Sequence, residues 1–490
     1  MKFFKSINKI ILSGLLLGTC ACDSWLYLEP QDAIVKQEFW QTKEQVESAV
    51  VGAYSSLIGG TNPTVGEQMF IWGELRADMV SPTPFASSSE IEIANANILD
   101  TNPVVNWRAF YRTINFCNTV LQFAPQTMEV DKTFEEAKLT NFLGEARSLR
   151  SLMFFYLVRS FGDVPLKLDA TVSDDQDLQI PKSPQEAVLK QIRRDLIQAE
   201  TETPITYGNT ASDKGRVTKY TVNALQADVY LWSELYDSCV IACDKIINSN
   251  KFGLVQPWYR TLFVTGNSNE SIFELQYGTQ RHPFFLMLNP VQRFGAAPTV
   301  LEEVYTLDLM NPLNVDVRAD GGALRSDGSI WKYMGVDRDT RRANVAPYPN
   351  WIVYRFADVL LMKAEALNQL GRGAEALAIV EQIRRRANAL TATAKDPDSS
   401  DSDAIADYIL EERARELAFE GKRWYDVLRN AKRNNYARQN ILLEMVAKSA
   451  PVERQQTIVN KYRDQRSHYF PIYTFELQTN KNLVQNPFYQ

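Results

Sequence analysis

Residues 356–386 read FADVLLMKAEALNQLGRGAEALAIVEQIRRR, a stretch that specifies two helices packed against each other. Apolar residues recur at the 3.6-residue spacing of an amphipathic helix on both sides of Leu370-Gly371, where the pattern is interrupted. Small alanines occupy the positions at which two antiparallel helices touch: Ala364, Ala366, Ala374 and Ala376. This arrangement predicts a helix hairpin of the tetratricopeptide type.

The same pattern occurs elsewhere along the chain. Residues 221–248 carry alanines at the same kind of position and divide into two helices at 233–236. Further helices are predicted at 104–121, 145–161 and 404–420. The hairpins do not follow a fixed 34-residue period, because long insertions rich in glycine, proline, asparagine, aspartate and serine separate them. We therefore expect a mostly α fold, in which tetratricopeptide-like hairpins form one body with minor β structure, such as a strand at 271–276. The irregular insertions lie chiefly at 60–103, 255–345 and 389–403.

The composition excludes several classes of function. Of the 490 residues, 45% are hydrophobic and 23% are charged, as in an ordinary globular protein. The 53 Lys and Arg against 59 Asp and Glu give a net charge of −6, so the basic face that nucleic acid requires is not expected. His282 and His468 lie far apart, which disfavours histidine-rich metal sites and Ser-His or Cys-His catalysis. We predict no metal, no cofactor and no catalytic residue.

The first 22 residues have the features of a lipoprotein signal. Three lysines precede the apolar segment 10–18, which is too short to span a bilayer. Small residues and a cysteine follow, in an order that resembles a bacterial lipobox, where the cysteine after the cleavage site is acylated. We expect residues 1–21 to be removed and Cys22 to be lipidated. Cys20 also fits the pattern, and an ordinary cleaved signal is the alternative.

Three cysteines remain beyond this anchor: Cys117, Cys239 and Cys243. The last two are one helical turn apart, a geometry that is awkward for a disulfide and supplies too few ligands for zinc. We interpret all three as buried thiols, so the hydrophobic core rather than a disulfide framework must hold the protein together.

Two charged segments suggest special chemistry but have simpler explanations. The acidic loop 396–403 lacks the central glycine and the closing glutamate of a calcium loop, so a solvated loop that caps the next helix is favoured. Glu412, Glu416 and Glu420 are closely spaced on helix 404–420. An acid–base pair needs carboxylates in contrasting environments, so structural ion pairing is favoured. The arginines expected on this face or near it are Arg413, Arg423 and Arg429.

Several motifs, taken together, identify a family resemblance. Residues 22–30 read CDSWLYLEP, 161–166 read FGDVPL and 215–220 read GRVTKY. The other segments are Glu145-Ala-Arg, the run 355–367, the pairs Glu412-Arg413, Glu420-Gly421 and Arg423-Trp424, and the tail 471–487. This set resembles the SusD/RagB family, the surface nutrient-binding lipoproteins of Bacteroidetes, from the lipobox to the last residue. Tyr27, Tyr473 and Phe488 depart from the family pattern.

The resemblance implies an N-terminal SusD-like region, 22–230, packed with a C-terminal region, 231–490, as one body. It implies a protein without enzymatic activity, lipid-anchored at the outer membrane and exposed on the cell surface. Such a protein sits on a SusC-like TonB-dependent β-barrel transporter, captures a nutrient, most often an oligosaccharide, and delivers it. A peptide or another nutrient of the RagB type is an alternative ligand. A tetratricopeptide adaptor or a glycoside hydrolase is an alternative class.

Aromatic side chains in the insertions are the candidate ligand contacts. The CH faces of sugars stack on aromatic rings, and loops on a rigid scaffold commonly carry binding sites. Aromatic residues at helical spacing are assigned to the core, and so is Trp72, which lies in a segment similar to the family's. The predicted ligand-binding residues are Phe85, Phe284, Phe285, Phe294 and Trp331.

Overall fold

The computed structural model describes residues 39–173, 175–278, 287–288, 292–343 and 348–490, which are mostly helical. The helices of ten or more residues are α3 (Lys43–Ile58), α4 (Val65–Glu74), α6 (Arg108–Val130), α7 (Glu136–Phe161), α8 (Gln185–Glu202), α10 (Lys219–Trp232), α11 (Tyr236–Ile247), α14 (Phe356–Gln369), α15 (Gly373–Arg386), α16 (Ser402–Glu416), α17 (Arg423–Tyr436) and α18 (Gln439–Ser449). The shorter ones are α5 (Ser88–Ala94), α9 (Thr210–Gly215), α13 (Trp331–Met334), α19 (Gln455–Tyr462), α20 (Thr474–Thr479), the π-helical turns η2 (Arg260–Thr265) and η3 (Val300–Tyr305), and the 3-10 turns η1 (Pro103–Val105), η4 (Thr391–Thr393), η5 (Gln465–His468) and η6 (Pro487–Tyr489). The strands are β1 (Val80–Pro82), β2 (Val164–Pro165), β3 (Lys182–Ser183), β4 (Ser271–Leu275), β5 (Phe294–Ala296) and β6 (Trp351–Arg355).

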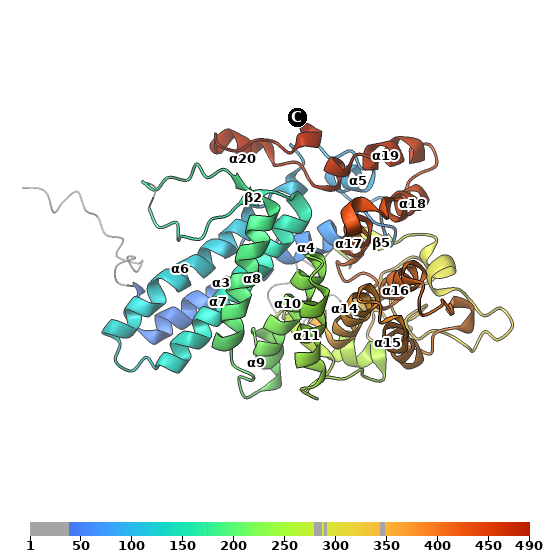
Figure 1. The fold of residues 1–490 in the computed structure, drawn as a ribbon, viewed down its shortest axis with the longest axis horizontal. Helices are drawn as coiled ribbons and strands as arrows, with labels where there is room; N and C mark the ends of the chain where they lie inside the picture. Colours follow the sequence, from blue (N-terminus) through green and yellow to red (C-terminus); the bar gives the residue numbers. More distant parts are fainter. Residues whose placement is uncertain (1–38, 174, 279–286, 289–291, 344–347) are drawn as a thin grey trace, which may run out of the picture.

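Successive helices pack side by side, so the body is a series of helix hairpins (Figure 1). Along this series α3 packs on α6, α6 on α7, α7 on α8, α8 on α10, α10 on α11, α11 on α14, and α14 on α15 and α16. The predicted fold class is confirmed, and the two predicted hairpin breaks lie between α10 and α11 and between α14 and α15. The helices predicted at 104–121 and 145–161 correspond to α6 and α7, and α7 begins nine residues earlier than expected.

The three cysteines are free and buried in the helical core, as predicted. Burial raises the pKa of Cys117 to about 12, so its thiol is uncharged at neutral pH and is a poor nucleophile. Cys239 directs its sulfur toward the carbonyl oxygen of Met362 at 3.9 Å, which connects α11 to α14. These thiols therefore pack as small apolar side chains.

The insertion 60–103, expected to be irregular, contains a helix at the centre of the molecule. All ten residues of α4 are buried. Thr64 and Glu67 form a capping box, in which each side chain accepts the backbone N–H of the other residue. A Cβ atom at Gly73 would lie 1.9 Å from the carbonyl oxygen of Gly421, so only glycine permits this close approach. The expectation failed because polar residues, Glu67, Gln68 and Glu74, lie among the buried positions of this short helix and interrupt any apolar periodicity.

Short strands connect segments that are far apart in the sequence. β4 pairs with β6, which confirms the strand predicted at 271–276. β1 pairs with β5 in antiparallel register, with Val80 opposite Ala296. This second pairing joins the insertion 60–103 to the insertion 255–345.

Four charged side chains of α16 lie in the interior and not on a solvated face: Glu412, Arg413, Arg415 and Glu416. Glu412 and Glu416 are fully buried and contact Arg318 at 2.7 and 2.9 Å. Burial by itself would raise the pKa of Glu412, but the Arg318 guanidinium lowers it to about 2. Ion pairing is therefore confirmed for these glutamates, but with other partners than expected. The three arginines expected near this face pair with other carboxylates. Arg413 pairs with Asp358 and Asp426. Arg423 pairs with Asp78, and Arg429 pairs with Glu365 and Asp426.

Candidate functional site

The β1–β5 pairing positions the turn that carries Phe85. Directly after β1, Thr83 donates its hydroxyl to the carbonyl oxygen of Gln292 at 2.5 Å and its backbone N–H to that of Arg293 at 3.0 Å. The N–H of Phe85 in turn donates to the Thr83 hydroxyl oxygen at 3.2 Å. Both long insertions therefore contribute to one place on the surface.

Phe85 presents a large apolar ring to solvent, since 67% of the residue is exposed. Phenylalanine is among the residues most often buried, and here an ordered turn holds the ring outside the core, where a ligand can reach it. Of the five predicted ligand contacts, Phe85 is the one that the described residues show on the surface.

Arg293 lies beside this turn and is held by two carboxylates. Its guanidinium pairs with Glu90 and lies 3.8 Å from Oε1 of Glu67. Each glutamate also closes a capping box with its other oxygen: Oε2 of Glu67 accepts the N–H of Thr64 at 2.9 Å, and Oε2 of Glu90 accepts that of Ser87 at 2.8 Å. The first turns of α4 and α5 therefore determine where the guanidinium sits.

A hollow of about 320 Å³ opens between these groups. Phe85, Arg293, Glu67 and Glu90 line it together with Asn62. The ring offers a face for the CH groups of a sugar, Arg293 offers N–H donors, and the carboxylates and the Asn62 amide can accept hydroxyl protons. This combination suits a ligand that is rich in hydroxyl groups and has apolar ring faces.

The structure corrects the expectation that Phe294 and Trp331 are available to a ligand. Phe294 is 1% exposed and packs on Phe70 with their ring centroids 5.9 Å apart. Trp331 is 5% exposed, and its indole N–H donates to the carbonyl oxygen of Asp337 at 2.8 Å. Both rings are part of the core because strand β5 and helix α13 turn them inward. Phe284, Phe285 and Cys22 lie outside the described residues.

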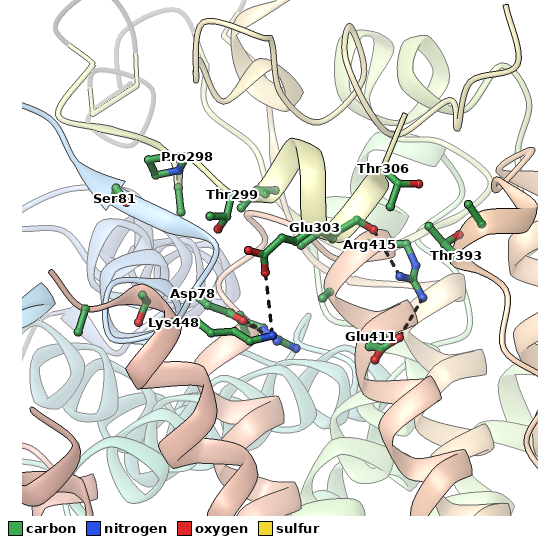
Figure 2. Close-up of a pocket in the computed structure, with 18 of the residues that line it drawn as sticks. Asp78, Ser81, Pro298, Thr299, Glu303, Thr306, Thr393, Glu411, Arg415 and Lys448 are labelled. Atoms are coloured by element: carbon green, nitrogen blue, oxygen red, sulfur yellow. Dashed lines mark hydrogen bonds and ion pairs between the residues drawn. The ribbon is translucent and has the colours of Figure 1, made fainter. Parts of the chain in front are cut away.

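A larger cavity, of about 670 Å³, lies where β1, η3, α16 and the end of α18 meet (Figure 2). Its rim carries ion pairs: Asp78 contacts Arg423 at 2.7 Å, and Glu303 reaches toward Lys448 at 4.0 Å. Its lining residues are aliphatic, polar or charged, and none is aromatic. Because this cavity offers no ring for stacking, we place the candidate ligand site at the smaller hollow beside Phe85.

Glu67, Glu90 and Arg293 did not emerge from the sequence interpretation. The two glutamates had a signal, because Thr64-x-x-Glu67 and Ser87-x-x-Glu90 both have the spacing of a capping box. Arg293 had no such signal in the sequence, since only the β1–β5 pairing brings it close to the glutamates.

The described residues contain no group of three or more His, Cys, Asp or Glu side chains arranged to hold a metal ion. In the loop 396–403, Asp401 accepts the N–H of Ala404 at 3.0 Å, which confirms that this loop caps α16. Within the same part of the chain, no helix combines the length and the apolar character that crossing a bilayer requires.

The scaffold of helix hairpins thus holds an exposed ring and a charged hollow on joined loops. Two family models match the chain: "Starch-binding associating with outer membrane" over residues 25–231 and "SusD family" over residues 296–489. The chain therefore belongs to the SusD/RagB family, which confirms the resemblance seen in the sequence. Proteins of this family are generally carbohydrate- or nutrient-binding lipoproteins associated with the outer membrane.

Relatives match the chain over most of its length. SusD-like protein P38 of Formosa agariphila is 29% identical, with 88% of this chain and 93% of the relative covered. SusD-like protein P2 of the same organism is 26% identical, with 86% and 90% covered. A SusD superfamily structure from Bacteroides vulgatus has a TM-score of 0.75 at 21% identity and covers 92% of this chain and all of its own. The structure of B. fragilis NanU has a TM-score of 0.69 at 23% identity, and the match covers 94% of this chain and all of NanU.

Proposed function

We propose that this protein captures an oligosaccharide at the cell surface and delivers it to a SusC-like TonB-dependent transporter in the outer membrane. Family membership supports nutrient capture, and the description of the matching N-terminal model supports a glycan and this location. A lipid on Cys22 holds the protein at the membrane in this proposal. A protein tethered in this way has no path of its own across the membrane, so delivery needs a transporter as partner.

The observation that carries the glycan assignment is the exposed Phe85 ring next to Arg293, Glu67 and Glu90. A stacking face bordered by fixed donors and acceptors is what a sugar ring requires. The turn and the two capping boxes fix these groups before the ligand arrives, so little side-chain freedom is lost on binding.

Binding of a glycan panel to the Phe85→Ala variant tests this proposal. Loss of one stacking contact costs on the order of 1 kcal/mol or more, so we expect about fivefold weaker binding or a larger loss by isothermal titration calorimetry. Phe475→Ala is the matched control, because Phe475 is also a phenylalanine that is largely exposed, at 55%, but lies on α20 and does not line the hollow. Equal glycan affinity of folded Phe85→Ala and the parent protein would move the site elsewhere.

A peptide is the second candidate ligand, and the charged lining favours it. The Arg293 side chain is 29% exposed and can donate to a carboxylate or carbonyl oxygen of a peptide. A peptide panel measured beside the glycans separates the two. Peptide binding that weakens in Phe85→Ala, without any glycan binding, would replace the oligosaccharide as the ligand.

A further inference from the structure

Residues 307–313, called the docking loop below, expose a cluster of large apolar side chains. Leu309, Met310 and Leu313 are 84%, 95% and 91% exposed, and Leu307 is 53% exposed. Single exposed apolar residues are normal on protein surfaces, but a contiguous group marks an interaction site. The docking loop follows η3 and belongs to the yellow segment that projects on the side of the molecule opposite α3 and α6 (Figure 1).

The side chain of Asp308 orders the docking loop. Its Oδ1 accepts the backbone N–H of Asn311 at 2.9 Å, and its Oδ2 accepts the side-chain amide of Asn314 at 2.9 Å. The apolar side chains are therefore presented by a turn that is already formed. Docking such a turn costs less conformational entropy than ordering a flexible one.

A recess lies at the base of the docking loop. It has a volume of about 210 Å³, and its apolar lining includes Leu307, Leu309, Pro312 and Leu390. A recess of this size can receive an apolar side chain of a partner, while Met310 and Leu313 protrude toward that partner. This surface thus has both protruding and concave parts, as complementary protein interfaces do.

The charge around the docking loop is negative. Residues 302–317 contain Glu302, Glu303, Asp308 and Asp316 but no lysine or arginine. Asp316 is neutralised in the interior by Arg318 at 2.7 Å and Glu303 lies 4.0 Å from Lys448, whereas Glu302 and Asp308 have no cationic partner among the described residues. A surface that fits the docking loop therefore has an apolar groove with a neutral or basic rim.

We propose that the docking loop binds the barrel transporter, through an apolar groove with a neutral or basic rim on the transporter's exposed side. This inference rests on the proposed function, which requires such a partner, and it adds the surface by which the partner is held. A protein is favoured over a lipid surface, because segments that enter membrane interfaces carry Lys, Arg, Trp or Tyr and the docking loop has none of these. A second copy of this chain is disfavoured, because a two-fold contact would bring identical acidic rims together.

Co-purification of the full-length lipoprotein from detergent-solubilised outer membranes tests this surface. The test variant is Leu309→Asp with Leu313→Asp. The matched control is Leu178→Asp with Val484→Asp, which alters two apolar loop residues of 45% and 60% exposure elsewhere on the surface. The barrel is identified by mass spectrometry and quantified against the lipoprotein. We expect at least tenfold less barrel with the test variant, the parent amount with the control, and the parent ligand affinity in both.

The remaining outcomes contradict either the docking surface or the proposed function, and they are distinguishable. If the test variant recovers as much barrel as the parent, the docking surface is overturned and the proposed function stands. If the parent itself recovers no barrel, the proposed function fails and the docking surface with it. A concentration-dependent dimer in light scattering that the test variant abolishes would assign the surface to a second copy. Flotation with lipopolysaccharide vesicles that the test variant abolishes would assign it to the membrane.

Discussion

Glu74 ends α4 in the interior, where its side chain joins two distant parts of the chain. Its Oε1 accepts the backbone N–H groups of Gly421 and Lys422 at 2.8 and 3.2 Å. Burial raises the pKa of Glu74 to about 8, although these two hydrogen bonds and the nearby Arg423 oppose the rise. The carboxyl group is therefore neutral in the folded protein at pH values where it is ionised in the unfolded chain.

The raised pKa predicts that Glu74 lowers the stability of the fold as the pH rises. The folded protein holds this proton from about pH 4.5 up to about pH 8 and the unfolded chain does not, so the favourable contribution is present at low pH and is lost across this range. Glu74→Gln keeps the oxygen that accepts both N–H groups but cannot ionise. We expect the stability of this variant relative to the parent to increase between pH 5 and pH 8, by on the order of 1 kcal/mol or more.

Thermal melting of both proteins at several pH values measures this difference. His468, whose pKa is lowered to about 4 chiefly by burial, contributes equally to both melting curves and cancels in the comparison. Glu129→Gln replaces an exposed glutamate on α6 and should show no such trend. A difference between Glu74→Gln and the parent that stays constant from pH 5 to pH 8 would mean that Glu74 is already ionised in the fold.

Single aromatic residues show how far the sequence could identify the candidate site. Residue type and insertion membership were enough to select Phe85, which is exposed, but they selected Phe294 and Trp331 equally. The difference lies in tertiary partners: β1 and Phe70 cover Phe294, and the chain around Asp337 covers Trp331. No local pattern contains that information for Phe294, since β1 and Phe70 come from another part of the fold, and the segment that covers Trp331, although near in sequence, has no regular pattern to predict it.

Helices were predictable where apolar residues recur regularly over a long stretch, even in the largely buried α14, and not in the short α4, where polar residues interrupt the pattern. α14 and α15 have apolar stripes and small residues at their contact, so their hairpin and its break were both correct. α4 includes Glu67, Gln68 and Glu74 among ten buried residues, so its polar positions give no amphipathic rhythm. Its capping box at Thr64 was the signal that could have revealed it.

The interior charges of α16 connect elements that the helix hairpins alone would leave separate. Arg355, between β6 and α14, donates to Glu270 at 2.7 Å, to Glu416 at 2.6 Å and to Glu420 at 2.9 Å. Glu416 also binds Arg386 of α15. All of these groups are nearly or fully inaccessible to solvent, so each charge depends on its partners for solvation.

Removing Arg355 should therefore destabilise the fold strongly. Arg355→Met leaves the carboxylates of Glu270, Glu416 and Glu420 without a shared counter-charge, and breaking a buried pair typically costs about 3–5 kcal/mol. We expect a clear fall of the urea unfolding midpoint, measured in urea because this denaturant does not screen charges. The unfolding midpoint of Arg355→Lys should lie between those of the parent and of Arg355→Met, because lysine keeps the charge but not the forked N–H donors of the guanidinium.

An exposed arginine provides the comparison. Arg372 pairs with Glu375 at 2.7 Å, but the two side chains are 46% and 56% exposed, so Arg372→Met should leave the midpoint almost unchanged. Equal midpoints for Arg355→Met and Arg372→Met would show that the interior charges of α16 do not hold the helices together.

In the whole molecule, the proposed docking loop and the start of the described chain lie on opposite sides (Figure 1). The described chain begins beside α3, on the side of the molecule opposite the docking loop (Figure 1). In the proposed function a lipid near the N-terminus confines the protein to the membrane that holds its partner. Confinement raises the effective concentration of the two proteins, so a few apolar side chains can maintain the proposed contact.

This argument requires a lipid on Cys22, which metabolic labelling with a palmitate analogue can test. Stable attachment takes more than one acyl chain, because a single chain binds membranes reversibly. We expect the label and the outer-membrane location to be lost in Cys22→Ala and retained in Cys20→Ala, which is the matched control two residues away. The reverse pattern would move the anchor to Cys20. Absence of label from the parent protein and both variants would remove the tether, and the docking surface would then have to bind the transporter tightly by itself.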